Sequence, residues 1–470
     1  MPIVPLFGLG QQGKSATVTA QRHLNLYAEI QREPDKTTIA FYGTPGLTLL
    51  TTFGDTPVRG MLPVGDFLYC VHRGTFWEVN NAGVKVSRGT LNTTSGRVDM
   101  SYNGTQVIIA DGTNAYLYTI ASAAFSVVGS NLFANPATIT YQDSYFIASF
   151  GDDQRFQISG QYDGASWDAL DFASAESSPD ELVRVIADHG EITLCGEDTI
   201  EFWGNSGGQD FPYSNIRGAT QEFGLAARWS LVKFNDSLAG LMKNRMGQVQ
   251  VMMAVGHSLK KISTEELDSI INSYTSVADA TAYSYMLGGH PMYQINFPSA
   301  GKSWLYDGST GLWSELESGL SGGRHRGEIC VDYVNKPRVS DFENGNIYTL
   351  DPDAHTDNGA AIPREIVGKH FFQNYKHGEV FRLQVDFETG VGLSSGQGDV
   401  PQAMLQVSKD NGHTWGNEMW ETLGAIGAHL TRVVWRRLGS ARDWVFKIRI
   451  TDPVKVVITG ASIDARPGND

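Results

Sequence analysis

A hairpin pattern recurs seven times between Val58 and Leu350, and no other feature limits the fold of this chain as strongly. In each repeat, a short apolar run leads to a pair of small or polar residues and a second apolar run follows. These pairs are 38, 39, 47, 46, 53 and 47 residues apart, close to the roughly 40–50 residues of a four-stranded propeller blade. The pairs are Gly65-Asp66, Asn103-Gly104, Gln142-Asp143, His189-Gly190, Asn235-Asp236, Gly288-Gly289 and Asn335-Lys336.

The runs beside these turns have the composition of β-strands. Phe67–Val71 and Gln106–Ala110, for example, are short and rich in β-branched and aromatic residues. An isolated hairpin cannot bury its apolar face in water, so the blades must pack against one another around a ring. The repeats therefore predict a β-propeller of six or seven blades. Two apolar segments before the first repeat, residues 37–42 and 47–50, are candidates for the strand that closes the ring.

At 470 residues the chain is longer than a single compact core usually allows, so two domains are expected. Residues 1–36 show no periodicity and are expected to form an N-terminal arm on the domain surface. The propeller is assigned to residues 37–352. Five strand-like segments without a helical pattern follow within residues 364–470 and predict a C-terminal β-sandwich. The predicted fold class is therefore all-β.

One short helix is predicted, as an insertion near residues 263–272. Ser263 stands three residues before Glu266, which is the spacing of a capping box. Leu267 and Ile270 then fall on one face of the helix. The segment lies within the longest spacing between repeats, where an insertion is expected.

The charge of the chain is unevenly distributed. The formal net charge is −15, with −16 in residues 1–363 and +1 in residues 364–470. An acidic propeller argues against affinity for nucleic acid, although DNA could still pass through an assembly that surrounds it.

No apolar run is long enough to span a membrane, and no secretion signal is present. We expect synthesis in a reducing cytoplasm, with the three cysteines as free thiols.

Residues Gly8 to Ser15 match the phosphate-binding pattern G-x-x-x-x-G-K-[ST], in which Lys14 would contact a triphosphate. The context argues against that function. Pro2 and Pro5 interrupt the segment where a strand must precede the loop, and the residues after Ser15 favour an extended chain over a helix. No cofactor is therefore expected.

The sandwich contains one Asp-box, the pattern S-x-D-x-G-x-T-W. Its residues are Ser408, Asp410, Gly412, Thr414 and Trp415. The motif is interpreted as a folding device, because the aspartate can bind turn amides and the tryptophan can cover the hairpin. It is a weak indicator of catalysis, and the sequence shows no catalytic constellation.

An acidic loop follows the last repeat. Asp351, Asp353, His355 and Asp357 alternate as in a calcium loop, but position twelve is Ile362, where such a loop needs glutamate. A solvated linker is the preferred interpretation. No metal site is predicted.

The last strands of the chain are rich in cations and tryptophan. Trp435, Arg436, Arg437 and Arg442 form the candidate subunit interface, because Trp and Arg are favoured at protein contacts. A solvated sheet face is the alternative.

Several short stretches resemble the tail hub proteins of short-tailed phages, a family also called tail accessory factors or packaged-DNA stabilization proteins. The C-terminal run Val434–Gly439, with Arg442, Phe446–Arg449 and Pro453-Val454, is similar to the closing segment of that family. The other similar stretches, in chain order, are Met1–Ile3, Thr199–Phe202, Ile270–Thr275 and Phe387–Val391.

The resemblance implies a non-enzymatic virion protein made in the host bacterium. It implies a homo-oligomeric ring of six copies below the portal and its adaptor ring. That ring would close the DNA channel together with a tail needle or plug, retain the packaged genome, and anchor the needle, tailspikes or fibres. Double-stranded DNA would pass through the lumen without specific binding. No catalytic residue comes with the resemblance.

Two other functions remain open from the residues alone. A propeller glycosidase acting on host surface polysaccharide would use the blades and the Asp-box, but the acidic residues are too numerous to select a catalytic pair. A receptor-binding propeller could grip sugar through aromatic loops such as Phe211–Tyr213. Turnover of polysaccharide by the purified chain distinguishes the first of these from a structural role.

Overall fold

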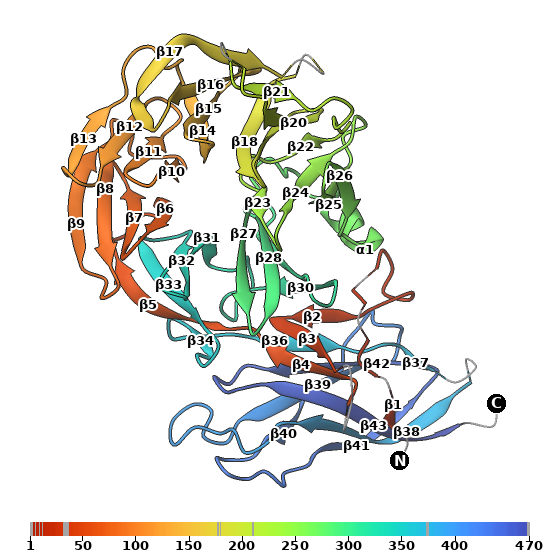
Figure 1. Ribbon diagram of the computed structural model, residues 1–470. Helices are drawn as coiled ribbons and strands as arrows, with labels where there is room; N and C mark the ends of the chain where they lie inside the picture. Colours follow the sequence, from red (N-terminus) through yellow and green to blue (C-terminus); the bar gives the residue numbers. More distant parts are fainter. Residues whose placement is uncertain are drawn as a thin grey trace.

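The computed structural model describes residues 3–4, 6–8, 10–11, 13–31, 37–175, 178, 180–208, 211–372 and 376–467. These residues form a β-propeller and a β-sandwich that lie side by side (Figure 1). Each predicted turn pair joins two antiparallel strands that are neighbours in one sheet. At His189 and Gly190, for example, φ is 49° and 81°, a left-handed conformation that tight hairpins require.

The described residues form seven propeller blades, within the range predicted from the sequence. Blade one contains β6 (Val58–Val64), β7 (Phe67–His72), β8 (Thr75–Asn80) and β9 (Lys85–Thr90). Blade two contains β10 (Asp99–Tyr102), β11 (Gln106–Ala110), β12 (Ala115–Thr119) and β13 (Ala124–Val127). Blade three contains β14 (Pro136–Gln142), β15 (Tyr145–Phe150), β16 (Arg155–Gly160) and β17 (Asp163–Ser174). Blade four contains β18 (Leu182–Asp188), β19 (Glu191–Gly196), β20 (Ile200–Asn205) and β21 (Tyr213–Asn215).

The later blades are less regular. Blade five contains β22 (Gly224–Leu225), β23 (Val232–Lys233), β24 (Leu238–Lys243), β25 (Val249–Val255) and β26 (Ser258–Lys261). Blade six contains β27 (Thr281–Leu287), β28 (His290–Phe297), β29 (Lys302–Asp307) and β30 (Leu312–Leu316). Blade seven contains β31 (Gly327–Asp332), β32 (Pro337–Asp341), β33 (Asn346–Asp351) and β5 (Gly46–Thr52), with β34 (Thr356–Asp357) and β35 (Ala360–Ala361) beyond.

The ring is closed by a strand from the N-terminal part of the chain. Of the two candidate segments, residues 47–50 lie in β5, which pairs antiparallel with β33. A buried apolar cluster lies between each pair of adjacent blades, and the cluster between blades seven and one includes Val58, Leu68 and Ile347. Each blade thus buries both faces, as a closed propeller requires.

The helix is α1 (Glu265–Ile271). Its N-cap is Thr264, whose side chain accepts a hydrogen bond from the amide of Leu267; the predicted cap, Ser263, instead bonds the backbone of Val251 in the neighbouring strand. In the part of the chain that the structure describes, no helix has the length and apolar character needed to cross a membrane.

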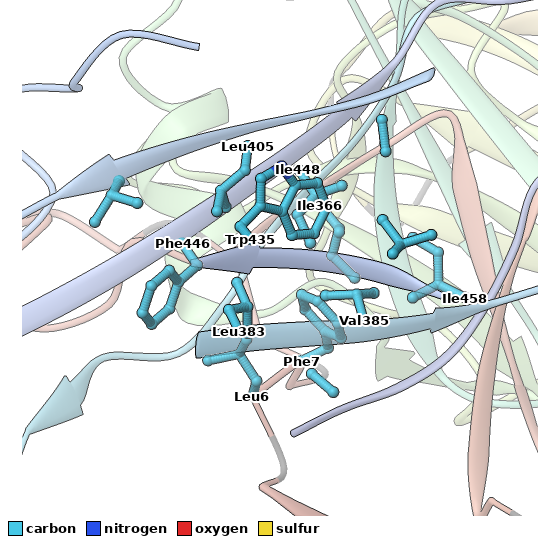
Figure 2. Packing of buried hydrophobic residues seen from close by; sticks show 14 of the residues in the cluster. Leu6, Phe7, Ile366, Leu383, Val385, Leu405, Trp435, Phe446, Ile448 and Ile458 are labelled. Carbon is cyan, nitrogen blue, oxygen red and sulfur yellow. The ribbon is translucent and has the colours of Figure 1, made fainter. Parts of the chain in front are cut away.

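The sandwich is formed by strands from both ends of the chain. One sheet contains β1 (Ile3–Val4), β3 (Leu26–Ile30), β4 (Ile39–Gly43), β38 (Gly378–Phe387), β41 (Val433–Ala441) and β43 (Val457–Pro467). The second sheet of the sandwich faces the first and contains β2 (Arg22–Leu24), β36 (Arg364–Val367), β37 (Phe371–Phe372), β39 (Gln402–Ser408), β40 (Met419–Thr422) and β42 (Asp443–Ile450). Figure 2 shows the apolar side chains between the sheets, among them Leu383, Trp435 and Phe446.

The strand pairing differs from the residue ranges assigned from the sequence. Residues 37–42 were expected in the propeller, but β4 pairs with β3 and β43 in the sandwich. Within the expected N-terminal arm, residues 22–30 form strands of the sandwich sheets. The pairings of β4 with β43 and of β2 with β36 join residues hundreds of positions apart, and local sequence patterns cannot predict such pairings.

Candidate assembly surfaces and the propeller–sandwich junction

The four residues of the candidate subunit interface separate into two groups. The Trp435 side chain is buried in the sandwich core, and its indole Nε1 donates to the carbonyl of Met419 at 2.9 Å. Arg436, Arg437 and Arg442 are exposed. Trp435 is therefore part of the core in the single chain, while the three arginines remain candidates for a contact.

A β-bulge shapes the surface around these arginines. The register between β38 and β41 shifts between Val380 and Arg382, and Arg437 on the opposite strand has a φ of 61°. Phe381 lies in the bulge and is 45% exposed. Bulges re-aim side chains at sheet edges, and here the irregular segment carries an exposed aromatic ring and exposed guanidinium groups.

A second candidate surface, which we call the apolar tip, lies in two loops of the sandwich. Hydrogen bonds join the loops: the amide of Gly427 donates to the carbonyl of Gly390 at 3.0 Å. The tip consists of Leu393, Val400, Ile426 and Leu430, which are 38%, 47%, 67% and 96% exposed. Large apolar side chains exposed on two adjoining loops make this region a candidate for a protein contact.

The propeller and the sandwich are joined by continuous hydrogen bonding. Strand β2 pairs with β30 of blade six on one side and with β36 of the sandwich on the other. Arg22 within β2 forms ion pairs with Glu315 at 2.7 Å, Glu317 at 3.1 Å and Glu365 at 3.0 Å. Because these carboxylates belong to both domains, the arginine fixes their relative position.

Asn25 adds a second link at the same junction. Its amide Nδ2 donates to the carbonyls of Glu317, in the propeller, and Pro363, before the sandwich, at 2.9 and 2.7 Å. The amide of Glu317 donates back to Asn25 Oδ1 at 3.0 Å. The side chain is almost fully buried, so these bonds replace water that Asn25 would otherwise bind.

The Asp-box forms a hydrogen-bonded turn. Asp410 accepts bonds from the Thr414 hydroxyl at 2.6 Å, the Thr414 amide at 2.9 Å and the Ser408 hydroxyl at 2.7 Å. These bonds, led by that from Thr414, hold the pKa of Asp410 well below its usual range. The Gly412 amide donates to Ser408 Oγ at 2.9 Å. The carboxylate is thus occupied within its own turn.

Trp415 of the Asp-box packs on the N-terminal segment. Its ring joins a small apolar cluster with Ala16, Ala20, Val367 and Val445. The Lys447 ammonium lies 4.3 Å from the centre of the ring on the sandwich side. The tryptophan therefore connects its hairpin to the domain junction.

The phosphate-binding pattern has no matching geometry in its described residues. After Gly13, residues 14–18 form bends and turns, with the Val18 amide donating to the Ser15 carbonyl at 3.0 Å. A phosphate loop needs a helix whose first amides face the ligand; Leu9 and Gln12 of the pattern lie outside the described residues.

The acidic loop after blade seven ends in a buried aspartate. Asp357 pairs within β34 and accepts a bond from the Ser318 hydroxyl at 2.7 Å. Burial raises its pKa. Among the described residues, no three acidic, histidine or cysteine side chains are grouped so that they could hold a metal ion.

Aromatic residues proposed for sugar binding contribute to a blade interface instead. Tyr213 is buried, and its hydroxyl donates to the Gln142 carbonyl at 2.9 Å. Phe211 packs against the same cluster between blades three and four. Neither ring lies on an open aromatic platform.

Sequence reasoning did not identify the junction residues Arg22, Glu315 and Glu365. They are separated by up to 343 positions, and charged residues at such distances show no pattern before the strands pair. The local signal near β2 is the alternation of the apolar residues Leu24, Leu26 and Ala28, which suggests a strand but not its partners.

Both domains match models of known protein families. A family model described as the β-propeller of bacteriophage P22 Gp10 matches residues 1–355, and a second, the β-sandwich of the same protein, matches residues 363–466. The tail hub protein gp10 of Salmonella phage P22 is 24% identical over 332 residues. That alignment covers 68% of this chain and 66% of the relative, just under two thirds of its length.

Solved structures show weaker similarity. The computationally designed Ika8 protein gives a TM-score of 0.40 at 12% identity and covers 71% of this chain and all of its own. YCF48 bound to a D1 peptide gives a TM-score of 0.42 at 12% identity, covering 68% of this chain and all of its own. Both scores are too low to carry an argument. The two family models together span nearly the whole sequence, and the chain therefore belongs to the bacteriophage P22 Gp10 family.

Proposed function

We propose that this protein is a structural tail hub protein of a short-tailed phage. Copies of it form a homo-oligomeric ring of six below the portal and the adaptor ring. The ring closes the DNA channel with a tail needle or plug, retains the packaged genome, and anchors the needle, tailspikes or fibres. The observation that carries this proposal is membership of the Gp10 family over both domains.

The architecture supports a mechanical role. The propeller is closed by β5, and the sandwich is joined to it through β2 and the ion pairs of Arg22. Two domains joined in this way should move as one rigid unit and transmit load between them. Exposed arginines near the bulge and the apolar tip give the sandwich two surfaces suited to heterologous contacts, which close into a ring when the rotation matches.

The charge distribution suits a channel through which DNA passes without adhering to the wall. Residues 1–363 carry a net charge of −16. DNA that must leave the head rapidly cannot adhere to the channel wall, and negative charge disfavours phosphate contacts. The protein is a virion component and not an enzyme, in keeping with the tail hub relative.

The experiment has two parts. Sedimentation velocity and electron microscopy of the purified chain, alone and mixed with its adaptor ring, should show a closed ring in at least one condition. A chain that stays monomeric in both would overturn the ring. Particles lacking the chain should contain heads that fill and then lose DNA; particles that keep their DNA but fail to adsorb would indicate a receptor-binding protein.

A further inference from the structure

Arginines gather around the axis of the propeller, although the domain as a whole is acidic. The innermost strands, β6, β10, β14, β18, β23, β27 and β31, surround the centre of the ring (Figure 1). Five arginines lie in these strands or a few residues before them: Arg59 in β6, Arg97 before β10, Arg184 in β18, Arg228 before β23 and Arg324 before β31. Residues 1–363 carry a net charge of −16, so positive charge at the axis stands out against its surroundings.

Contacts across the ring bring these arginines together. The guanidinium carbon of Arg97, in blade two, lies 4.7 Å from the centre of the Trp229 ring, in blade five. That of Arg184, in blade four, lies 5.2 Å from the same ring. Arg184 Nη1 also donates to the carbonyl of Arg228 at 3.0 Å. The arginines therefore share one end of the axis, with Trp229 between them.

Most of this positive charge has no carboxylate partner. Among the described residues, Arg324 is the one arginine of the five with an ion pair, from Nη1 to Glu328 at 2.6 Å. Arg97 forms neither an ion pair nor a hydrogen bond in that part of the chain. Burial lowers its pKa to about 10; attraction to Glu328 opposes this shift and repulsion from Arg184 adds to it. A largely buried cation without a counter-charge is costly, so a bound anion would stabilise the fold.

A pocket of about 360 Å³ opens beside Arg97, where blades seven, one and two meet. Its volume is in the range of sites that hold small ligands. We call it the arginine pocket; its wall consists of residues 56–59, 94–97, Arg324, Glu328, Ile329 and Phe342. Three arginines and one glutamate give this wall a formal net charge of +2. The pocket lies at the seam between the first and last blades, the last being the blade that β5 closes.

Arg59 fixes the shape of the pocket. The residue is 6% exposed. All of its N–H donors are used, at distances of 2.6–2.8 Å, by the Thr93 hydroxyl and the carbonyls of Arg73, Thr93, Ser95 and Gly96. Arg59 is thus a positioning residue, because it holds the loop before β10 in place and has no donor left for a ligand.

The donors that a ligand can reach come from that loop and from Arg97. Thr94 and Ser95 are exposed, and their hydroxyls form no hydrogen bond within the described residues. Arg97 is partly exposed; its Nη1 is covered by protein, so Nε and Nη2 are the atoms offered to the pocket. Trp229 packs on a face of the guanidinium group and leaves its N–H edge free. A guanidinium edge beside two hydroxyls suits an anion with several oxygens.

We propose that the arginine pocket binds a phosphate dianion, either free phosphate or the terminal phosphate of a small monoester. Arg97, Thr94 and Ser95 donate to its oxygens, and its two charges balance the +2 of the wall. Glu328 is already paired with Arg324. The anion joins the first, second and last blades at the seam of the ring.

Other occupants match the pocket less well. A carboxylate has one charge and two oxygens, so it leaves part of the wall charge and some donors without partners, and a neutral sugar leaves all of the charge. Duplex DNA is too wide to enter a pocket of this volume, and each of its phosphodiesters carries a single charge. Phosphate binding here is therefore compatible with a channel wall to which DNA does not adhere.

The test is isothermal titration calorimetry of the full chain at about pH 8, where phosphate is mainly a dianion. Ionic strength is held constant with chloride, and the probes are inorganic phosphate, ribose 5-phosphate, acetate and a duplex oligonucleotide. At least one phosphate probe should bind at one site per chain, at least about tenfold more tightly than acetate. Tighter binding of one phosphate probe tells free phosphate from a monoester. Failure of both phosphate probes, equal binding of acetate, or displacement of phosphate by the duplex overturns the proposal.

Two variants and a matched control make the result specific. Arg97→Gln should weaken phosphate binding at least about tenfold. Ser95→Asp places a carboxylate on the exposed loop beside Arg97 and should weaken it by a similar factor. Arg245→Gln removes an exposed propeller arginine paired with Glu222 at 3.5 Å and should bind phosphate as the unmodified chain does.

Circular dichroism shows whether each variant folds. Ser95→Asp, on an exposed loop, keeps the test decisive if Arg97→Gln does not fold. Unchanged binding in Ser95→Asp, or an equal loss in Arg245→Gln, contradicts the assigned pocket. Ring formation is measured separately, so failure here leaves the proposed tail hub role standing.

Discussion

The guanidinium Nε of Arg22 lies 2.7 Å from Oε2 of Glu315, which joins a strand of the sandwich side to the last strand of blade six. Burial by itself would raise the pKa of Glu315, but attraction to Arg22 and Lys302 outweighs it and the net shift is downward. The pair is therefore charged in the folded state down to acidic pH. It contributes stability above the ordinary glutamate pKa and loses it as the pH falls below that value.

Replacing Arg22 should weaken the junction. In Arg22→Met, the Glu315 and Glu365 carboxylates, each with only 7% of the side chain exposed, lose their shared cation. Removing one partner of a buried ion pair costs about 3–5 kcal/mol. Because Arg22 is partly exposed and Lys302 still pairs with Glu315, we expect a loss of about 2–4 kcal/mol. Urea denaturation should show this loss in the free energy of unfolding. The control is Arg73→Met, since the Arg73–Asp55 pair is exposed and should cost less than about 1 kcal/mol.

His23 should make the protein less stable in mild acid. Its pKa is about 4 in the folded protein, against an ordinary value of 6.5. The unfolded chain therefore binds a proton at a higher pH than the folded chain, and folding stability decreases as the pH falls from 6.5 to 4. Linkage gives a loss of about 3 kcal/mol over this interval. His23→Gln should flatten that part of the profile in urea denaturation at several pH values; an unchanged slope contradicts the assignment.

The Asp-box should control the order of its own hairpin. Asp410→Ala removes the acceptor of the Thr414 amide and hydroxyl, so the Thr414 amide should exchange with solvent at least about tenfold faster. Hydrogen exchange followed by mass spectrometry or NMR measures the effect. Asp464→Asn, an exposed substitution elsewhere in the sandwich, should leave the exchange unchanged.

The apolar tip should contribute to assembly and not to folding. Leu430 and Ile426 are mostly exposed in the single chain, so serine at either position should leave the unfolding midpoint unchanged. If the tip is buried in the ring, each substitution should weaken association about tenfold, measured by sedimentation. Leu170→Ser on the propeller, where Leu170 is 82% exposed, is the matched control. Equal effects of all three substitutions would remove the tip from the interface.

Arg437 should destabilise the folded chain and be retained because it serves a contact with another subunit. Its φ of 61° is unfavourable for a side chain with a Cβ, so Arg437→Gly should raise the free energy of unfolding by about 0.5–1 kcal/mol. Arg436→Gly removes the same charge from an ordinary strand position and should lower stability by about 0.5–1 kcal/mol. Urea denaturation distinguishes the two variants. A loss of assembly in the more stable Arg437→Gly would show that the arginine serves a contact.

Local chemistry explains which features the sequence predicted well. Turn pairs such as His189-Gly190 need left-handed φ values, and few residue types adopt them, so all seven hairpins were visible in the sequence. The strands between the turns are rich in β-branched and aromatic residues, a feature that a short stretch of sequence shows by itself. The all-β class, the propeller and the following sandwich could be predicted for this reason, and the family comparison agrees.

What the sequence by itself determined is thus the set of hairpins and the change of pattern after blade seven. Only the tertiary structure decided that Gly46–Thr52 closes the ring while Ile39–Gly43 joins the sandwich, that Trp435 faces the core, and that Arg22 meets Glu315. The physical reason is that strand partners, side-chain burial and ion pairs depend on contacts between residues hundreds of positions apart. Periodicity and turn chemistry act over a few residues and carry no record of those contacts.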